Sequence, residues 1–574
     1  MSENSDIQPG DRPWLRKYPL QVLPSYEYPK INVARMLIDS ARNYPDNEAV
    51  DFLGRSITYK ELLRQCRKMA DALRALPIAR GDRVAIMLPN CPQGVIAYYG
   101  ALMAGAVVVQ TNPTYTEREL RYQLTDSGAT VLIVLDLLMP RVLKAKENNT
   151  VLKTVIVTSL SDALPFPKNA LYPLKRRREY PGLRVEIRSS EGIFRWSSWL
   201  RKGKATDTCE EVDADADVAM IQYTGGTTGH PKGVMLTHAN LVANTIQTTA
   251  WFYRLEIGKE RYLAALPLFH VFGLTVLMNQ AVYRAGSLLL VPRFEPKLVL
   301  DTVRRRKPTL FPGAPTMYIA LLNDSSAREG DLDSIRFCIS GAAPLPRDVQ
   351  EKFEKKSGGR LIEGYGLTEA APVTHCNPIW GYRKNGTIGI PLPDTDARIV
   401  GEDSVEQLPV GQIGELAVRG PQVMKGYWNR PEETAGVLQD GWLRTGDLGT
   451  MDDEGYFSII DRKKDIILAG GFNVYPREIE EVLFEHPAVK EASVLGVPDP
   501  YRGETVKAYV VVKEGWQVSE MQLDRWCRDR LASYKVPKQY EFRSSLPLSL
   551  IGKVLRRKLR EEQNSEEEVN LNIT

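Results

Sequence analysis

The sequence predicts an α/β protein, with a large N-terminal domain of doubly wound sheets covered by helices and a small α+β domain after it. Two observations lead to this fold class. Strand and helix signals alternate in the first part of the chain, which is the pattern of a parallel sheet with helical crossovers. The C-terminal part breaks that alternation. We expect the large domain over residues 1–460, a hinge at 461–465 and the small domain over 466–574.

The first predicted helix covers residues 58–76, where apolar side chains recur at the spacing of one helical face. Thr58 and Glu61 form a capping box at its start. After a turn at Gly81, the apolar run 84–88 indicates a buried strand.

A second helix is expected to begin at Thr116, with Glu119 as its capping-box partner, and to end at Gly128. The apolar run 130–135 follows and indicates another strand. This order of strand, helix and strand is what predicts a parallel, doubly wound sheet.

The C-terminal residues predict a different kind of unit. Residues 492–497 and 506–512 have the composition of strands, and Ser519 is a suitable N-cap for an amphipathic helix that ends near Ala532. The charged segment 461–465 separates two apolar runs, so the boundary between the domains is placed there.

The composition is that of an ordinary globular protein. The 574 residues are 43% hydrophobic and 25% charged, which excludes a disordered, collagen-like or polytopic membrane protein. The net charge of +4 does not indicate nucleic acid as a partner. The six cysteines are dispersed and the N-terminal segment lacks an apolar signal core, so we expect a reduced protein of the cytoplasm.

Residues 175–204 interrupt the alternation of strands and helices with basic and aromatic residues. One interpretation is a solvated surface excursion. The other is a basic, aromatic patch, with Phe194, Trp196 and Trp199, that contacts an anionic membrane surface. On the second interpretation, membrane binding is peripheral and falls as the salt concentration rises.

The most informative segment is YTGGTTGHPKG at 223–233. Its glycines and threonines can wrap phosphate oxygens with backbone N–H groups and hydroxyls, and Lys232 adds a compact positive charge. It is not a Walker P-loop, because Pro231 and Gly233 stand where that motif needs Gly and Ser or Thr. Strand-like residues on both sides predict a loop that joins strand to strand.

This segment resembles the phosphate-loop signature of the acyl-adenylate-forming (AMP-binding) enzymes, and the resemblance extends from about residue 30 to residue 562. Within that superfamily the chain is most similar to bacterial long-chain fatty acid–CoA ligases. Further matching segments occur in the right order: TNPTYTERELRYQLTDSG (111–128), ALPLFHVFGLT (265–275), EGYGLTEAAPV (363–373), GPQVMKGYW (420–428), GWLRTGDLG (441–449), DRKKDIILAGGFNVYPREIE (461–480) and YKVPK (534–538).

The resemblance implies a nucleotide site. Tyr365 would stack on adenine, Thr368 would contact the α-phosphate and Glu369 would bind Mg²⁺, for which one carboxylate beside substrate phosphates suffices. The remaining implied nucleotide-binding residues of the phosphate loop and of the adenine-side turn are Thr224, Gly225, Gly226, Thr227, Thr228, Gly229, Lys232, Gly341, Ala342 and Ala343.

The resemblance also assigns catalytic residues. Lys553, which follows Gly552, would bridge the substrate carboxylate and the α-phosphate as negative charge rearranges during adenylation. The family usually has a Thr- or Ser-rich lead into this pair, whereas this chain has Ser-Leu-Ile at 549–551. His270 would border the acyl and thiol sites, although a histidine in an apolar segment is also compatible with a structural role.

Members of this family rotate the small domain between two half-reactions. The resemblance places the hinge at Lys464 and implies that Gly470 and Gly471 belong to the segment presented for the CoA step. It also implies that Asp447 accepts the ribose hydroxyls and that Arg462 lies on the ribose side.

The expected reaction is ATP-dependent activation of a fatty acid to acyl-AMP with release of pyrophosphate, followed by transfer to CoA, which gives fatty acyl-CoA and AMP. ATP, Mg²⁺ and CoA as cosubstrate are the implied cofactors. A long-chain acid is favoured because Phe269, Phe272 and Leu274 make the suspected pocket apolar.

Two alternatives are kept: a medium-chain or aryl acid–CoA ligase, and an acyl-AMP ligase that delivers to a carrier protein. The joint presence of Lys232, Glu369, Asp447 and Lys553 argues against a third class, a non-catalytic lipid-binding or scaffold protein. No nucleic acid is expected as a partner. Two further partners are left open, namely an anionic membrane surface at the inner face of the cell membrane and a second copy of the chain in a homodimer.

Overall fold

The structure is a computed structural model that describes residues 12–76, 78–147, 151–181, 183, 187–224, 231–402, 406–469, 472–499, 503–549 and 552–571. The chain forms two compact units. The first, called unit 1 here, comprises Met1–Asp396 and Arg419–Leu443, and unit 2 comprises Ala397–Val418 and Arg444–Thr574.

The largest sheet of unit 1 has eight strands in the order β18-β9-β8-β4-β3-β5-β6-β7. The strands from β7 to β8 run parallel, whereas β9 and β18 are antiparallel additions at one edge. Their bounds are β3 Arg83–Met87, β4 Val107–Gln110, β5 Val131–Leu135, β6 Thr154–Thr158, β7 Ile193–Arg195, β8 Val218–Thr224, β9 Lys232–Thr237 and β18 Gly426–Tyr427.

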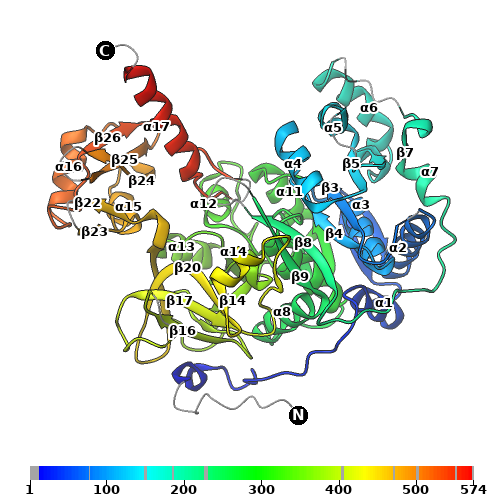
Figure 1. Ribbon diagram of the computed structural model, residues 1–574, viewed down its shortest axis with the longest axis horizontal. Helices are drawn as coiled ribbons and strands as arrows, with labels where there is room; N and C mark the ends of the chain where they lie inside the picture. The colour runs from blue at the N-terminus through cyan, green and yellow to red at the C-terminus, as the bar shows by residue number, and fades with distance from the viewer. Residues whose placement is uncertain are drawn as a thin grey trace. The chain divides into compact units, whose positions relative to one another are not determined.

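Helices connect the parallel strands, as the sequence predicted. Thr58 caps α2 by accepting a hydrogen bond from the Glu61 N–H, which is one half of the expected capping box. Both halves of the box between Thr116 and Glu119 are present at α4, whose C-cap Gly128 has a left-handed φ of 65°. In Figure 1 the helices lie around strands β3, β4 and β5. They are α2 Tyr59–Arg74, which precedes β3, and the connecting helices α3 Pro92–Met103, α4 Glu117–Ser127 and α5 Met139–Glu147.

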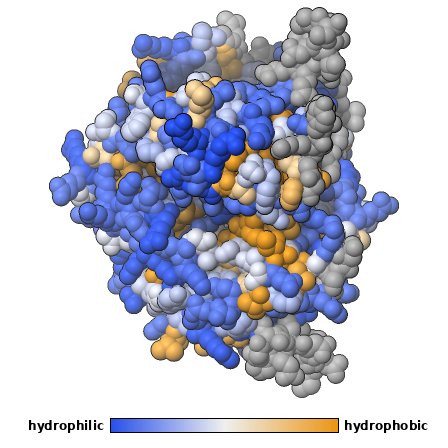
Figure 2. All heavy atoms as spheres, turned by 90° about the vertical axis from the view of Figure 1, so that its left-hand side faces the viewer, coloured by the Kyte–Doolittle hydropathy of each residue, from blue (hydrophilic) through white to orange (hydrophobic). Residues whose placement is uncertain are grey.

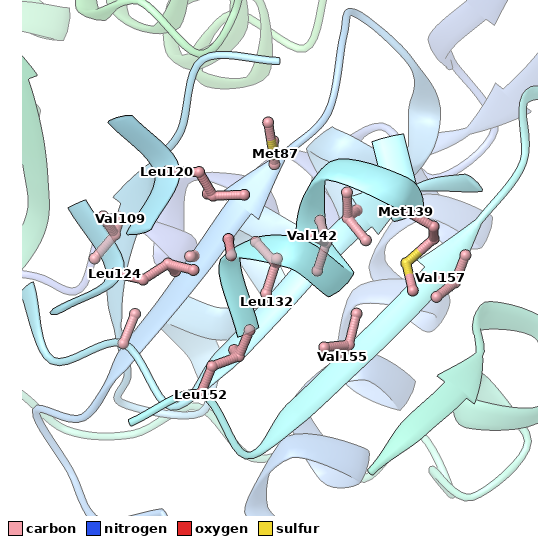
Figure 3. Packing of buried hydrophobic residues seen from close by; sticks show 14 of the residues in the cluster. Met87, Val109, Leu120, Leu124, Leu132, Met139, Val142, Leu152, Val155 and Val157 are labelled. Carbon is pink, nitrogen blue, oxygen red and sulfur yellow. The ribbon is translucent and has the colours of Figure 1, made fainter. Parts of the chain in front are cut away.

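Figure 3 shows the core between this sheet and two of its helices. Leu120 and Leu124 of α4, and Met139 and Val142 of α5, lie against buried strand residues that include Leu132. Burial of one such side chain stabilises the fold by about 1.5–3 kcal/mol. The buried apolar side chains of α4 and α5 therefore fix these helices to the sheet.

Two four-stranded sheets complete the framework of unit 1, in the orders β10-β11-β1-β2 and β12-β13-β14-β15. Their bounds are β1 Glu48–Phe52, β2 Arg55–Thr58, β10 Arg261–Ala264, β11 Ser287–Leu290, β12 Phe337–Ser340, β13 Arg360–Gly366, β14 Val373–Cys376 and β15 Ile390–Pro391. The accompanying helices are α1 Ala34–Asn43, α8 His238–Trp251, α10 Gln280–Tyr283, α11 Pro296–Arg306, α12 Pro315–Asn323 and α13 Arg347–Ser357.

Unit 2 is α+β, as predicted. The core of its sheet is a long antiparallel pair, β24 with β25. Strand β25 also pairs with β26 in parallel and with the short strand β22, which in turn pairs with β23. The bounds are β22 Ile467–Ala469, β23 Phe472–Val474, β24 Val489–Asp499, β25 Gly503–Val512, β26 Gln539–Phe542, α15 Pro476–Phe484, α16 Glu520–Arg528 and α17 Arg556–Leu571. Ser519 caps α16, but this helix ends at Arg528 and not near Ala532.

Unit 2 extends beyond the predicted small domain. It also contains most of β16 Asp396–Val400, β17 Gly414–Arg419 and β20 Trp442–Met451, together with β21 Phe457–Arg462. The predicted hinge at 461–465 lies within unit 2, at the end of β21 and in the 3-10 helix Lys463–Asp465. The division at 461–465 therefore stays a prediction.

The aromatic residues of the segment 175–204 do not form the surface patch that one interpretation of the sequence predicted. Trp196 and Trp199 of α7 (Trp196–Leu200) are 4% and 1% exposed, and Phe194 is half-buried, so these rings belong to the core and not to a surface patch. The pattern misled because amphipathic aromatic residues occur both at interfaces and in cores. The exposed apolar residues lie instead on or beside α6 (Lys168–Glu179).

Hydrophilic residues cover most of the face shown in Figure 2, and hydrophobic residues form smaller patches on it. Within the described part of the chain, none of the helices combines the length and the apolar character needed to cross a membrane.

Candidate functional site

The predicted phosphate loop joins two neighbouring antiparallel strands. Thr224 at the end of β8 pairs in register with Lys232 at the start of β9, so these two strands form an antiparallel hairpin. This confirms the strand–loop–strand arrangement that separates the segment from a Walker P-loop. The predicted loop residues Gly225, Gly226, Thr227, Thr228 and Gly229 lie outside the described residues.

Lys232 has two neighbours that the sequence did not indicate. Its ammonium group forms an ion pair with the carboxylate of Glu433, on α14 (Pro431–Val437). It also lies 5.0 Å from the centre of the Tyr427 ring. A carboxylate and an aromatic face both stabilise a cation. The charge of this lysine is therefore compensated from within unit 1.

Glu369 lies close to the same hairpin. It sits in the 3-10 turn Thr368–Ala370, which follows β13 and packs beside β9. The hydroxyl of Tyr427 donates a hydrogen bond of 2.9 Å to Glu369 Oε1, and the Met424 N–H donates one of 2.8 Å to the Glu369 carbonyl. Burial and the charge of Glu369 raise the pKa of Tyr427, so its hydroxyl stays protonated and remains a donor.

The predicted adenine-side turn follows β12 directly. Ser340, the last residue of β12, pairs in register with Glu363 of β13, the strand that carries Tyr365. A Cβ at Gly341 would lie 2.9 Å from Phe272 Cζ, so a larger residue at this position would require the Phe272 ring to shift. Ala342 holds a φ of 69°, a strained conformation for a residue with a Cβ.

His270 has a structural contact of its own. Its Nδ1 accepts a hydrogen bond of 3.2 Å from the Phe272 N–H and caps the short helix Val271–Gly273. Because Phe272 lies against Gly341, this segment meets the adenine-side turn. His270 therefore combines a capping role with a position close to the other predicted residues of unit 1.

A second group of predicted residues lies in unit 2. Asp447 of β20 and Arg462 of β21 pair in register, with Arg462 Nε 3.4 Å from Asp447 Oδ1. Burial lowers the pKa of Lys553 to about 7, with further lowering by the positive charges of Arg462, Arg556 and Lys464 that outweighs the opposing effect of Asp447.

Ion pairs anchor the chain around Lys553. Arg556 Nη2 lies 2.7 Å from Glu480 Oε1, and Arg556 Nη1 lies 3.0 Å from Asp465 Oδ2. Arg560 adds a 3.0 Å contact to Asp465. Desolvation and the charge of Arg462 lower the pKa of Lys464, next to Asp465. This network fixes the Lys553 segment to the predicted hinge residues within unit 2.

The sequence did not single out Arg556, Glu480, Tyr427 or Glu433. A basic residue three positions after a predicted catalytic lysine is a usable signal, but its acidic partners are distant in sequence. Gly470 and Gly471 lie outside the described residues.

The arrangement at Glu369 fits a magnesium ion that is shared with nucleotide phosphates. Mg²⁺ keeps several waters and takes one or two protein carboxylates beside substrate phosphate oxygens. Across the described residues, no group of three or more His, Cys, Asp or Glu side chains could hold a metal by itself. A single carboxylate oriented by Tyr427 is compatible with a metal that arrives with its nucleotide.

Comparison with known proteins identifies the class of this molecule. A family model described as "AMP-binding enzyme" matches residues 37–428, and one described as "AMP-binding enzyme C-terminal domain" matches residues 478–553. The chain therefore belongs to the AMP-binding enzyme family.

Curated relatives and solved structures narrow the class. A protein of Bacillus subtilis (strain 168) named long-chain-fatty-acid–CoA ligase is 51% identical over 96% of this chain and 98% of its own length. An Escherichia coli O157:H7 protein of the same name is 40% identical over the same shares. The crystal structure of ATP-bound MatB from Rhodopseudomonas palustris has a TM-score of 0.81 at 32% identity, and covers 92% of this chain and 98% of that one. The protein is an AMP-forming ligase.

Proposed function

We propose that this protein activates a long-chain fatty acid with ATP and transfers the acyl group to CoA. One observation carries the proposal: similarity to long-chain-fatty-acid–CoA ligases extends over 96% of the chain at 51% identity. The residues that such a reaction needs are present in both units, including a lysine beside a phosphate-loop hairpin and a second lysine with a lowered pKa.

The reaction has two steps. A carboxylate oxygen attacks the α-phosphorus of ATP, the bond to the β-phosphate breaks, and acyl-AMP and pyrophosphate form. The CoA thiol then attacks the acyl carbon and loses its proton, and AMP leaves. Oxide is a poor leaving group and AMP is a good one, so the first step makes the second possible. The first step therefore consumes ATP, which would bind with Mg²⁺, and the second step consumes CoA.

The nucleotide roles follow from the chemistry of each residue. Lys232 and the loop amides would bind phosphate oxygens, Glu369 would bind Mg²⁺, and Thr368 would contact the α-phosphate. Tyr365 and the turn Gly341–Ala343 would contact adenine. Asp447 and Arg462 would contact the ribose.

Lys553 suits the reacting centre for an electrostatic reason. Nearby cations and burial disfavour its charge in the free protein, and a carboxylate together with an α-phosphate would reverse that balance. A group that gains its full charge only when anions arrive stabilises the charge that develops during adenylation.

The acyl chain length is the finer part of the proposal. Phe272 is 6% exposed and Leu274 is buried, so an acyl site bordered by the segment after His270 would be apolar. A protein named feruloyl-CoA synthase from an Amycolatopsis species is 38% identical over 91% of the chain, which favours an aryl acid as the second candidate.

Pyrophosphate release tests substrate and acceptor together. The purified protein is assayed with saturated fatty acids of increasing length and with ferulic acid, each with and without CoA. Turnover that increases toward long chains and needs CoA supports the proposal. A preference for ferulic acid identifies an aryl acid ligase, and acyl-AMP that accumulates in spite of CoA indicates a carrier-protein acceptor.

The domain division and the hinge are also part of this proposal. A change of backbone angles at Lys464 would reorient the small domain between the two steps, and proline at that position fixes φ and restricts Lys463. Lys464→Pro should therefore separate the half-reactions, so that one survives in a single turnover while the other is lost. Equal loss of both steps would argue against a pivot at this residue.

Peripheral membrane contact is proposed at α6 and not at the tryptophans. Phe166 is 84% exposed, and Leu171 and Leu174 are exposed on the helix beside basic residues that include Arg177 and Arg178. Such a surface suits an anionic bilayer. Sedimentation with phosphatidylglycerol vesicles should decrease with salt and with the double substitution Arg177→Glu and Arg178→Glu. Binding unchanged by either would reject this surface.

A further inference from the structure

Strand β18 and helix α14 form one segment of unit 1 that contacts both Lys232 and Glu369. Tyr427 of β18 pairs with Val234 of β9, and the Trp428 N–H donates a hydrogen bond of 2.7 Å to the Gly233 carbonyl. The Tyr427 N–H donates another, of 2.9 Å, to Thr434 Oγ1 of α14. The first turn of α14 is therefore fixed beside Lys232.

Glu433 lies in that first turn between two cations. One of its carboxylate oxygens pairs with Lys232, and the other, Oε1, lies 3.6 Å from Arg430 Nε. Arg430 is itself held by Asp126, with 3.1 Å between Arg430 Nη2 and Asp126 Oδ1. Glu433 therefore keeps a counter-ion if Lys232 moves to another partner.

We propose that Glu433 is a competing counter-ion that nucleotide phosphates must displace from Lys232, and that it thereby sets the affinity for ATP. This inference rests on the proposed phosphate-binding role of Lys232. The side chains of Lys232 and Glu433 are 21% and 38% exposed, so phosphate can reach the pair. The negative charge of Glu433 also repels an incoming polyphosphate. Competition for Lys232 and this repulsion both weaken the binding of ATP.

The size of the effect follows from the exposure of the pair. Ion pairs that are open to solvent shift an equilibrium by roughly 1.5-fold to fivefold. Removal of the Glu433 charge should tighten the binding of ATP more than that of AMP, because ATP carries more negative charge. It should also decrease as salt screens the interaction.

Titration calorimetry with ATP and Mg²⁺, in the absence of fatty acid, tests the inference. Glu433→Gln removes the charge and should tighten ATP binding by roughly twofold to fivefold at low salt. Glu433→Asp keeps the charge and should bind nearly as the unmodified protein does. Glu432→Gln makes the same change at the neighbouring exposed position of α14 and should leave the dissociation constant unchanged.

Weaker or unchanged ATP binding in Glu433→Gln would overturn the inference, as would equal tightening for ATP and AMP. Lys232→Ala separates this failure from failure of the proposed function. If Lys232→Ala binds ATP as tightly as the unmodified protein, Lys232 does not contact phosphate. If it binds weakly while Glu433→Gln has no effect, only the role of Glu433 is rejected. A smaller gain from Glu433→Gln in the Lys232→Ala background is the expected coupling.

Discussion

The two predicted lysines lie in opposite electrostatic surroundings. Lys232 in unit 1 has a carboxylate and an aromatic ring against its ammonium group. Lys553 in unit 2 is surrounded by Arg462, Arg556 and Lys464, and Asp447 compensates only part of that charge. One cation is already satisfied in the protein without ligands, and the other is not.

This difference suggests different work for the two residues. A compensated lysine must exchange partners when phosphate binds, so it contributes mainly to affinity and selectivity. A lysine whose surroundings are only partly compensated, as at Lys553, gains most when negative charge arrives beside it, so it contributes to the step in which that charge develops.

The largest effect among the tests of unit 1 is expected at Glu369. Glu369→Gln keeps the shape of the side chain but removes the charge that would hold Mg²⁺, so adenylation should fall on the order of 100-fold. The Mg²⁺ concentration that gives half-maximal pyrophosphate release should rise. A normal Mg²⁺ titration would show that another carboxylate binds the metal, and Glu432→Gln provides a control for the chemical change.

Substitution of Tyr427, the neighbour of both Lys232 and Glu369, should have a smaller effect. Tyr427→Phe keeps the ring beside Lys232 but removes the hydroxyl that orients Glu369. Loss of an outer hydrogen bond to a metal ligand lowers metal affinity by roughly tenfold. The half-maximal Mg²⁺ concentration should therefore rise while the dissociation constant for metal-free ATP stays nearly constant. Tyr283→Phe, at an exposed tyrosine of α10, serves as the control. A change in both constants would indicate general damage.

The smallest effect is a stability difference at Lys553. Its pKa falls from an ordinary value of 10.5 to about 7 in the folded protein, so the unfolded chain binds more protons between these two values. The cost to stability is complete below pH 7 and is relieved as the pH rises toward 10.5.

Lys553→Met should therefore raise the thermal midpoint at pH 7, by a few degrees, and the gain should shrink as the pH approaches 10. Differential scanning calorimetry at pH 7 and near pH 10 measures the thermal midpoints, with Lys558→Met as a matched control at an exposed position of α17. A difference that grows with pH would contradict the electrostatic surroundings described for Lys553.

Local signals predicted the elements that position the site. The Thr116 capping box and the Gly128 terminus were readable because their partners lie within a few residues, and so was the hairpin around the phosphate loop. The same holds for Ser519, although the end of its helix was misplaced because propensity alone marks a C-terminus poorly.

Long-range contacts could not be read in this way. Glu433 meets Lys232, and Tyr427 meets Glu369, only because β18 adds to β9 from far along the chain. The burial of Trp199 could not be predicted either, because a short aromatic and basic segment has no period that separates core from interface.

The most direct test of the account compares the two half-reactions of Lys553→Ala on one preparation. Adenylation is measured as single-turnover pyrophosphate release with a long-chain fatty acid, and thioesterification as acyl-CoA formation from supplied acyl-AMP. Adenylation should fall by about 10²–10³-fold while thioesterification is largely retained, because Lys553 serves only the first step. Equal loss of both half-reactions, or normal adenylation, would contradict it.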